Sequence, residues 1–157
     1  MSHAIENVRD YPRPPSLERV NYQIRIVLGG VEIVNTTHAW RVLETFHPPT
    51  YYIPQSAFSA GSILPAAGQS LCEWKGQARY FSLVAGGKTA SRCAWAYANP
   101  TPAFQPIANH LALYVAAMDA CFVDGEQAKP QPGGFYGGWV NSWITGPVKG
   151  APGTTHW

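Results

Sequence analysis

Three glycine turns between β-forming segments constrain the fold of this chain more than any other feature of its sequence. Gly29-Gly30, Gly86-Gly87 and Asp124-Gly125 each separate two short segments that read as strands. Glycine adopts a positive φ at little cost, and Gly-Gly and Asp-Gly are strong signals for two-residue hairpin turns. Three such hairpins in 157 residues predict a mainly β fold, an antiparallel β-barrel or sandwich.

Helical signals are few and short. Pro102–His110 predicts one short helix, because proline fits the first helical turn. His38–Glu44 fits either one or two helical turns or a strand with alternating side chains. Leu111–Met118 either continues the preceding helix or begins a strand, and its pattern fits both. We therefore expect one or two short helices beside the sheets.

The composition changes along the chain and divides it into three parts. Residues 1–20 hold three prolines and predict an extended N-terminal arm. Residues 21–129 carry the hairpins and predict the β domain. Residues 130–157 form a Gly- and Pro-rich tail with three tryptophans: Trp139, Trp143 and Trp157. A free linker does not need tryptophans, so the tail is predicted to pack on the core or on a partner subunit.

Charge and cysteine content exclude several classes of protein. Charged residues make up 13% of the chain and the net charge is +2, too little for electrostatic capture of nucleic acid. No apolar run approaches the roughly 18 residues of a membrane span. The chain lacks a signal-peptide pattern and CxxC pairs, so we expect a cytoplasmic protein with reduced thiols and no metal. Scarce charge and surplus aromatics predict a homo-oligomer, with a dimer as the expected form.

The segment from Glu44 to Pro54 is the first candidate for a site. Its three prolines stiffen the chain and hold Glu44, His47, Tyr51 and Tyr52 in a fixed relation. A glutamate and a histidine three positions apart can act as acid and base, so Glu44 and His47 are the candidate catalytic residues. The alternative is a proline-fixed crossover whose polar groups satisfy the neighbouring backbone.

Two further segments carry candidate ligand contacts. Trp74-Lys75-Gly76 places an aromatic face, an ammonium and a flexible backbone together, which suits an anionic or carbonyl-bearing ligand, and Tyr80 follows. Cys72 is either a nucleophile activated by Lys75 or a packed thiol.

Trp95 and Tyr97 point to one side of a predicted strand, where they either pack in the core or line a pocket mouth. The motifs GxxxxGK[ST], GxGxxG, GxSxG and HExxH are absent from the sequence. We therefore expect no bound cofactor.

The order of these blocks resembles the family known as domain of unknown function 427 (DUF427). The family pattern is a Gly-Gly hairpin, VLE, PPxYY, C-x-(W/Y)-K-G-x-A-x-Y, AW-x-Y-x-x-P and VDGE. The matching positions here are Leu28–Gly30, Val42–Glu44, Pro48–Pro54, Cys72–Tyr80, Ala94–Pro100 and Val123–Glu126. The match spans about residues 21–128, and Phe135–Trp139 resembles the extension of one subgroup.

The resemblance implies a compact antiparallel β structure grouped with the β-tent folds. Proteins in that group hold zinc through CxxC pairs, which this sequence lacks, so the resemblance carries over no metal. A nucleotidyltransferase-like label is attached to the family. Such enzymes need paired carboxylates for two Mg²⁺ ions, and the sequence has no DxD or ExD pair.

Three hypotheses of function follow from the sequence. In the first, an aromatic pocket with Lys75 binds a small polar or anionic metabolite. In the second, the same pocket is an active site with Glu44 or His47 as general base and Lys75 or Tyr80 as acid or electrostatic stabiliser. In the third, the chain is a structural or interaction module that assembles through its Trp-rich tail. The predicted ligand contacts are Tyr51, Tyr52, Trp74, Lys75, Tyr80, Trp95 and Tyr97.

Overall fold

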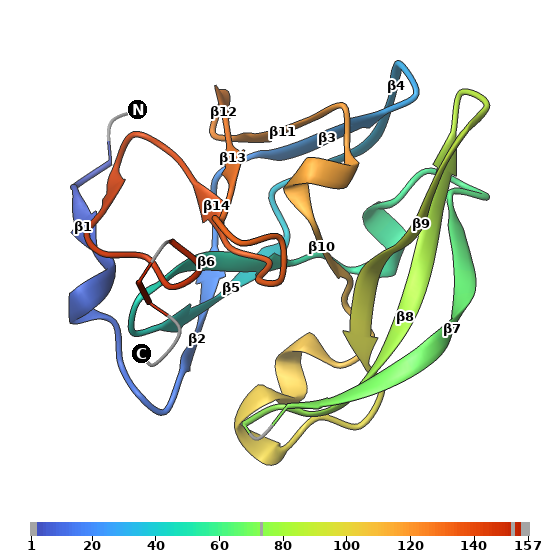
Figure 1. Ribbon diagram of the computed structural model, residues 1–157. Helices are drawn as coiled ribbons and strands as arrows, with labels where there is room; N and C mark the ends of the chain where they lie inside the picture. Colours follow the sequence, from blue (N-terminus) through green and yellow to red (C-terminus); the bar gives the residue numbers. More distant parts are fainter. Residues whose placement is uncertain (1–2, 73, 152, 155–157) are drawn as a thin grey trace.

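The chain folds almost entirely into short β-strands joined by tight turns (Figure 1). The computed structural model describes residues 3–72, 74–151, 153 and 154. The strands are β1 (Glu6–Asn7), β2 (Ser16–Val20), β3 (Ile24–Leu28), β4 (Val31–Thr36), β5 (Ala39–Glu44), β6 (His47–Tyr52), β7 (Ile63–Cys72), β8 (Gly76–Ala85), β9 (Lys88–Tyr97), β10 (Ala112–Leu113), β11 (Ala120–Val123), β12 (Glu126–Gln127), β13 (Lys129–Pro130), β14 (Trp139–Val140) and β15 (Ile144–Thr145). Short 3-10 helices lie between them: η1 (Val8–Asp10), η2 (Gln55–Ala57), η3 (Pro102–Ile107) and η4 (Val115–Ala117). The mainly β fold predicted from the sequence is confirmed.

All three predicted hairpins form. β3 and β4 meet at Gly29-Gly30, β8 and β9 at Gly86-Gly87, and β11 and β12 at Asp124-Gly125. Both residues of each turn have a positive φ, between 48° and 85°, which is what a type I′ turn requires. The local sequence signal and the backbone geometry therefore agree.

The strands pair in separate antiparallel sheets. Their orders are β12-β11-β3-β4, β10-β9-β8-β7 and β2-β5-β6, with β13–β14 and a parallel β1–β15 as small additional pairs. Among the described residues the sheets do not close into the predicted barrel, because closure needs a paired neighbour on both sides of every strand. Pro48 and Pro49 in β6 and Pro65 in β7 lack the amide proton for a further ladder, and both strands end their sheets.

The segments with ambiguous patterns are decided by their partners in space. Residues 39–44 are the strand β5, since β5 pairs with β2 on one side and with β6 on the other. Leu111–Met118 divides into β10 and the turn η4. The helix predicted from Pro102 is the 3-10 helix η3, with Pro106 inside it. A proline there removes an amide donor, which keeps the segment short.

Two glycine turns of different sheets touch at their tips. A Cβ atom on Gly86 would lie 1.9 Å from the carbonyl oxygen of Gly29, so the contact leaves no room for a side chain. The Asp119 carboxylate accepts a hydrogen bond from the backbone N–H of Gly30 (2.8 Å) and one from the Lys88 ammonium (3.1 Å). These contacts join the β3–β4 and β8–β9 hairpins.

Both ends of the chain pack against the sheets. From the N-terminal 20 residues, expected as an arm, β1 pairs with β15 and β2 pairs with β5. In the C-terminal part, Trp139 and Trp143 are 1% and 6% exposed, while Trp157 lies outside the described residues. The described part of the tail therefore buries its tryptophans against its own chain.

The core has two parts, and the smaller one supports the candidate site. The larger cluster joins β3, β4 and β11 to the N- and C-terminal segments. The smaller cluster consists of Val42, Tyr52, Ala78, Tyr97, Phe104, Ile107 and Ala112. It lies between β6, β8, β9 and η3, at the base of the long β7–β8–β9 sheet in Figure 1.

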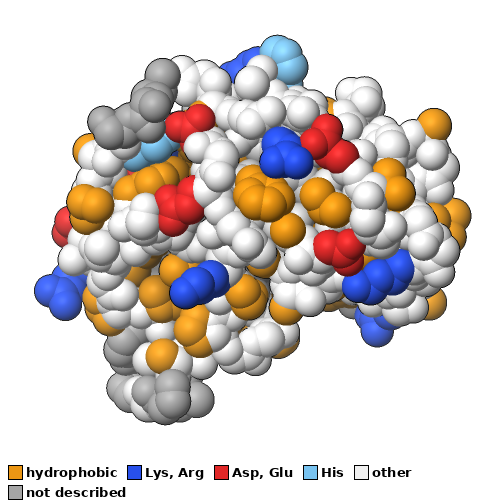
Figure 2. Space-filling view, turned by 90° about the horizontal axis from the view of Figure 1, so that it is seen from above, with side chains coloured by type: hydrophobic (Ala, Val, Ile, Leu, Met, Phe, Trp, Pro, Cys, Tyr) orange, Lys and Arg blue, Asp and Glu red, His pale blue; other side chains and the backbone are white. Residues whose placement is uncertain are grey.

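Charged side chains are sparse and mixed in sign on the surface. On the face shown in Figure 2, Lys and Arg side chains alternate with Asp and Glu among many uncharged groups. This face does not present the continuous basic surface that nucleic acid needs. Within the described residues, no helix is both long enough and apolar enough to cross a membrane.

Candidate functional site

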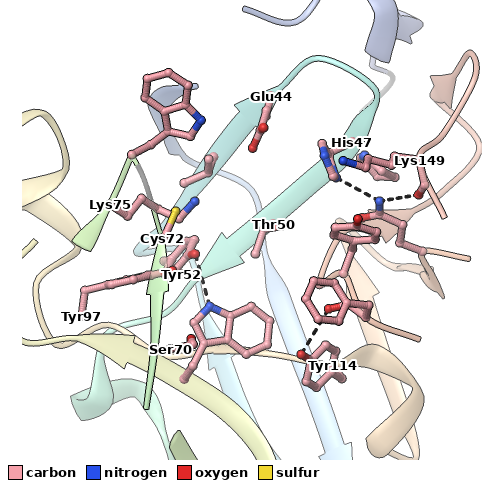
Figure 3. Close-up of a pocket in the computed structure, with 18 of the residues that line it drawn as sticks. Glu44, His47, Thr50, Tyr52, Ser70, Cys72, Lys75, Tyr97, Tyr114 and Lys149 are labelled. Atoms are coloured by element: carbon pink, nitrogen blue, oxygen red, sulfur yellow. Dashed lines mark hydrogen bonds between the residues drawn. The ribbon is translucent and has the colours of Figure 1, made fainter. Parts of the chain in front are cut away.

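A cavity of about 440 Å³ lies where β6, the β7–β8 hairpin and the C-terminal segment meet (Figure 3). Its volume is within the range of pockets that bind small molecules. The walls come from the β5–β6 hairpin, the β7–β8 hairpin, the end of β9 and residues 131–149. Segments far apart in the sequence thus share one concave surface.

Most of the candidate residues named from the sequence line this cavity. They are Glu44, His47, Tyr52, Trp74, Lys75, Tyr80, Trp95 and Tyr97. Cys72 lines it as well. The three sequence segments that carry these residues therefore meet in space.

Tyr51 is the exception, because it faces away from the cavity. Neighbouring residues of a strand point to opposite faces, so Tyr52 and Tyr51 cannot share a site. The Tyr51 hydroxyl lies 2.7 Å from that of Tyr22, and its ring centroid lies 5.0 Å from that of Trp139. Tyr51 therefore belongs to the larger core and not to the cavity.

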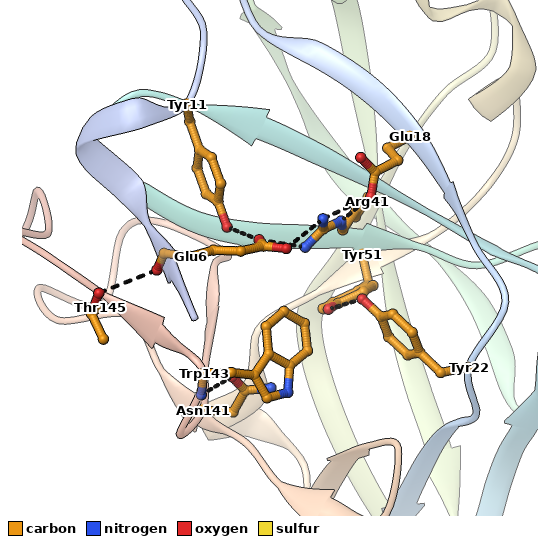
Figure 4. A network of polar contacts seen from close by, with 9 residues as sticks. All are labelled: Glu6, Tyr11, Glu18, Tyr22, Arg41, Tyr51, Asn141, Trp143 and Thr145. Atoms are coloured by element: carbon orange, nitrogen blue, oxygen red, sulfur yellow. Dashed lines mark hydrogen bonds and ion pairs between the residues drawn. The ribbon is translucent and has the colours of Figure 1, made fainter. Parts of the chain in front are cut away.

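A buried arginine organises the side of the sheet to which Tyr51 belongs (Figure 4). The Arg41 guanidinium donates two hydrogen bonds to the Glu6 carboxylate, at 2.9 and 3.0 Å, and another to Glu18 at 2.8 Å. The Tyr11 hydroxyl also donates to Glu6, at 2.5 Å. These bonds hold β1 and β2 against β5, so the role of this network is structural.

The C-terminal wall of the cavity was not predicted from the sequence. It consists of Gln131, Phe135, Tyr136, Gly137 and Lys149, and Thr50, Ser70 and Tyr114 are further lining residues that were not predicted. The density of aromatic residues in the tail indicated packing but not its place. The adjacent glycines at 137 and 138 are the sequence signal that could have indicated a close approach of the backbone to another segment. A Cβ atom on Gly137 would lie 2.4 Å from the Trp95 ring.

Lys75 places a buried ammonium in the cavity. The residue is 9% exposed, and its Nζ lies 6.0 Å from the centroid of the Tyr97 ring. Burial favours the neutral amine, but Tyr52, Cys72 and Glu44 favour the ammonium more strongly, and the pKa of Lys75 is raised. Lys75 is therefore charged at neutral pH. Among the described residues, no carboxylate lies within 4.0 Å of it.

Aromatic side chains form much of the lining of the cavity. Tyr52 is buried, and its hydroxyl accepts a hydrogen bond from Trp95 Nε1 at 3.4 Å. The ring of Tyr97 lies 6.3 Å from that of Tyr52, and the ring of Tyr114 lies 4.8 Å from that of Trp95. Burial raises the pKa of both Tyr52 and Tyr97, so the two phenols are uncharged at neutral pH.

The side-chain amide of Gln131 fixes the ring of His47. Its Oε1 accepts the N–H of Gly138 at 3.1 Å, so its Nε2 donates to the carbonyl of Lys149 (2.8 Å) and to His47 Nδ1 (3.0 Å). Because Nδ1 accepts, the proton of the neutral ring is on Nε2. Burial lowers the pKa of His47, Glu44 acts against this shift, and Lys149 adds to it. His47 is therefore neutral at neutral pH.

The charges in the lining are few. Lys75 and Lys149 carry the positive charges, and Glu44 is the carboxylate among the described lining residues. Glu44 stands opposite His47 across the β5–β6 turn. In the part of the chain that the structure describes, no group of three His, Cys, Asp or Glu side chains could hold a metal ion. The cavity therefore offers an ammonium, hydrogen-bond donors and aromatic surface to an organic ligand.

Comparison with known proteins gives a family for this chain. Residues 16–124 match the family model described as Domain of unknown function (DUF427). No curated protein matches the chain. The matched range includes the β5–β6 hairpin, Lys75 and β9, but ends before the C-terminal wall. Since it covers most of the chain, the resemblance seen in the sequence blocks is confirmed: the chain belongs to the DUF427 family.

Proposed function

We propose that the cavity binds a small organic anion whose charged group lies against the Lys75 ammonium. The observation that carries the proposal is the burial of Lys75 without a carboxylate within 4.0 Å among the described residues. Lys75 has a hydrogen bond to Cys72, and an anionic ligand would add the negatively charged partner. A carboxylate or a phosphate group suits an ammonium, which donates up to three hydrogen bonds.

The cost of burying the Lys75 ammonium favours the binding of an anion beside it. Removing an ammonium from water costs several kcal/mol unless a partner compensates. The rings of Tyr97 and Phe104, 6.0 and 5.8 Å from Lys75 Nζ, offset part of this cost, by about 0.5–2 kcal/mol each. A bound anion would add a charge-assisted hydrogen bond of about 1.5–3 kcal/mol. The cavity therefore presents an ammonium to which an anion can bind.

The state of His47 supports binding rather than base catalysis at this residue. Its Nδ1 accepts a hydrogen bond from Gln131, and its Nε2 carries the proton. A general base needs an unprotonated nitrogen within reach of the substrate proton. A ring held in this tautomer instead offers a hydrogen-bond donor to an anionic or carbonyl oxygen.

Ligand-detected NMR with paired probes tests the proposal. Benzoate and phenyl phosphate are compared with their neutral counterparts benzamide and phenol. We expect the anions to bind with a Kd of about 1 mM, or about −4 kcal/mol, and the neutral molecules at least tenfold more weakly. If neither anion binds, or if the neutral probes bind equally well, the proposal is wrong.

A lysine variant and a matched control test whether the anion contacts Lys75. Lys75→Met keeps the length of the side chain and removes its charge, and it should weaken anion binding about 10- to 150-fold. Lys129→Met makes the same change of net charge at an exposed lysine outside this cavity, and it should leave binding unchanged. Equal losses in both variants would show a nonspecific effect of net charge.

A further inference from the structure

We infer that the C-terminal segment, residues 131–149, is the specificity-determining wall of the cavity and that its Tyr136 selects anions with a flat, aromatic body. The inference rests on the proposed anion site at Lys75. It assigns the recognition of charge to Lys75 and the recognition of shape to Tyr136. The segment lies beyond residues 16–124, which match the family model. The shape selectivity therefore comes from a part of the chain that the matched domain does not include.

The wall is held rigidly in place. Gln131 is 3% exposed, and its amide bonds the backbone of Gly138 and of Lys149 at once. The backbone N–H of Lys149 donates to the carbonyl of Phe46 at 2.8 Å. A wall fixed at its first and last residues can impose a shape on a ligand, because little conformational entropy is lost on binding.

The glycine pair brings the wall directly onto the cavity. A Cβ atom on Gly137 would lie 2.4 Å from the Trp95 ring, and one on Gly138 would lie 2.8 Å from the carbonyl oxygen of Pro48. The backbone at Gly137 therefore runs directly against the Trp95 ring of β9, and the backbone at Gly138 lies close to that of Pro48 in β6. This close approach places Tyr136 among the residues that line the cavity.

Three contacts orient the Tyr136 ring. Its centroid lies 5.0 Å from that of His47 with the planes at 67°, and 5.0 Å from that of Phe135 with the planes at 82°. The Lys149 ammonium lies 5.6 Å from the centroid. Edge contacts and a cation hold an aromatic ring in one orientation. Tyr136 is thus a preset surface for a second aromatic ring.

Further aromatic residues of the cavity adjoin this wall. Trp95 and Tyr114 form a pair with centroids 4.8 Å apart, and the Tyr114 hydroxyl donates to the carbonyl of Phe135 at 3.3 Å. Figure 3 shows Tyr114 and Lys149 on the C-terminal side of the cavity, and Lys75 and Tyr97 on the other. A ligand anchored at Lys75 therefore extends its body towards aromatic surfaces, which favour flat rings over puckered ones.

The test compares two carboxylates of equal charge and similar size. Benzoate has a flat aromatic ring and cyclohexanecarboxylate has a puckered aliphatic one. By NMR titration the wild-type chain should bind benzoate about 3- to 10-fold more tightly. Tyr136→Ala should reduce this preference to less than twofold, whereas Tyr136→Phe, which keeps the ring, should retain it. Phe122→Ala, an aromatic truncation outside the cavity, should leave it unchanged.

The outcomes separate this inference from the proposed function. If both carboxylates bind and both weaken in Lys75→Met, but the preference for benzoate persists in Tyr136→Ala, the assignment to the C-terminal wall is wrong and the anion site stands. Equal affinities of the wild-type chain for the two carboxylates would also overturn it. If neither carboxylate binds or neither responds to Lys75→Met, the proposed function fails first. Circular dichroism of each variant establishes that it is folded.

Discussion

Gln131→Met is the change that most directly tests how the cavity is built. The substitution keeps the length of the buried side chain but removes its amide. It takes a hydrogen-bond acceptor from the N–H of Gly138 and donors from the carbonyl of Lys149 and from His47 Nδ1. No other side chain among the described residues reaches all three groups, so the wall loses this side-chain link to the β5–β6 hairpin and keeps the backbone bond from Lys149 to Phe46.

The magnitude follows from the burial of these groups. The bond to Gly138 is fully buried, and its unpaired N–H would cost about 1–3 kcal/mol. The groups on Lys149 and His47 are partly buried, so water replaces part of what they lose, at about 0.5–1 kcal/mol each. The apolar thioether regains about 1 kcal/mol. We expect a net loss of about 2 kcal/mol, which lowers Tm by about 4–8 °C at this chain length.

Urea denaturation followed by tryptophan fluorescence measures the change. The midpoint should fall while the m-value stays constant, because the surface exposed on unfolding is the same. The matched control is Gln127→Met, the same substitution at an exposed glutamine, with an expected effect within about 0.5 kcal/mol. In parallel, the nitrogen chemical shifts of the His47 ring should show Nε2 protonated in the wild type and a mixture of tautomers in Gln131→Met.

A small effect would refute the reasoning. If Gln131→Met loses less than about 0.5 kcal/mol and the His47 tautomer is unchanged, then the amide does not hold the wall. The attachment of the C-terminal segment would then come from its tryptophans and from backbone bonds such as that between Lys149 and Phe46.

Three more predictions concern the scaffold. Burial acts to raise the pKa of Glu6, but its hydrogen bonds, above all those from Arg41, lower the pKa below the ordinary value of 4.5. The Glu6 carboxylate therefore stabilises the fold fully above pH 4.5. This contribution is lost as the pH falls through the lowered pKa. Glu6→Gln should remove this acid dependence from urea midpoints measured between about pH 3 and pH 7, and an unchanged acid branch would contradict the pairing. Gly87→Ala, at a φ of 78° with open space around it, should destabilise the fold by about 1–2 kcal/mol. Gly86→Ala should destabilise it by at least about 2 kcal/mol more, because its Cβ would lie 1.9 Å from a carbonyl oxygen. Equal losses of Tm in the two variants would disprove the close contact. Trp139→Ala should destabilise the fold by about 3–5 kcal/mol. Trp139→Phe should destabilise it by less than half as much, because the buried indole N–H has no hydrogen-bond partner among the described residues. Equal losses of stability in chemical denaturation would show that this N–H is hydrogen-bonded.

Much of the fold could be predicted because its signals are local. Gly29-Gly30, Gly86-Gly87 and Asp124-Gly125 determine their turns within two residues, since only a few residue types tolerate a positive φ. By contrast, residues 39–44 have a pattern that fits helix and strand. Their partners β2 and β6 decide between the two, and this pairing is not written in the segment itself.

In the candidate site, too, some residues could be identified from the sequence and others only from the tertiary structure. Glu44, His47 and Lys75 were found from residue type and stiffened context, and the structure places all three around one cavity. Tyr51 and Tyr52 have the same residue type and the same context, so nothing in the sequence separates them. The alternation of β6 does, because the pairing of this strand turns Tyr52 to the cavity and Tyr51 to the core.

The sequence by itself determined the turns, the mainly β class, the family and the segments with chemically useful side chains, because each depends on residue types a few positions apart. Only the tertiary structure decided that the sheets stay open, which of two tyrosines faces the cavity, and that residues 131–149 form its wall. Those outcomes depend on contacts between residues far apart in the sequence, such as Gln131 and His47, which are 84 positions apart. The geometry of such contacts arises from the packing of the whole chain.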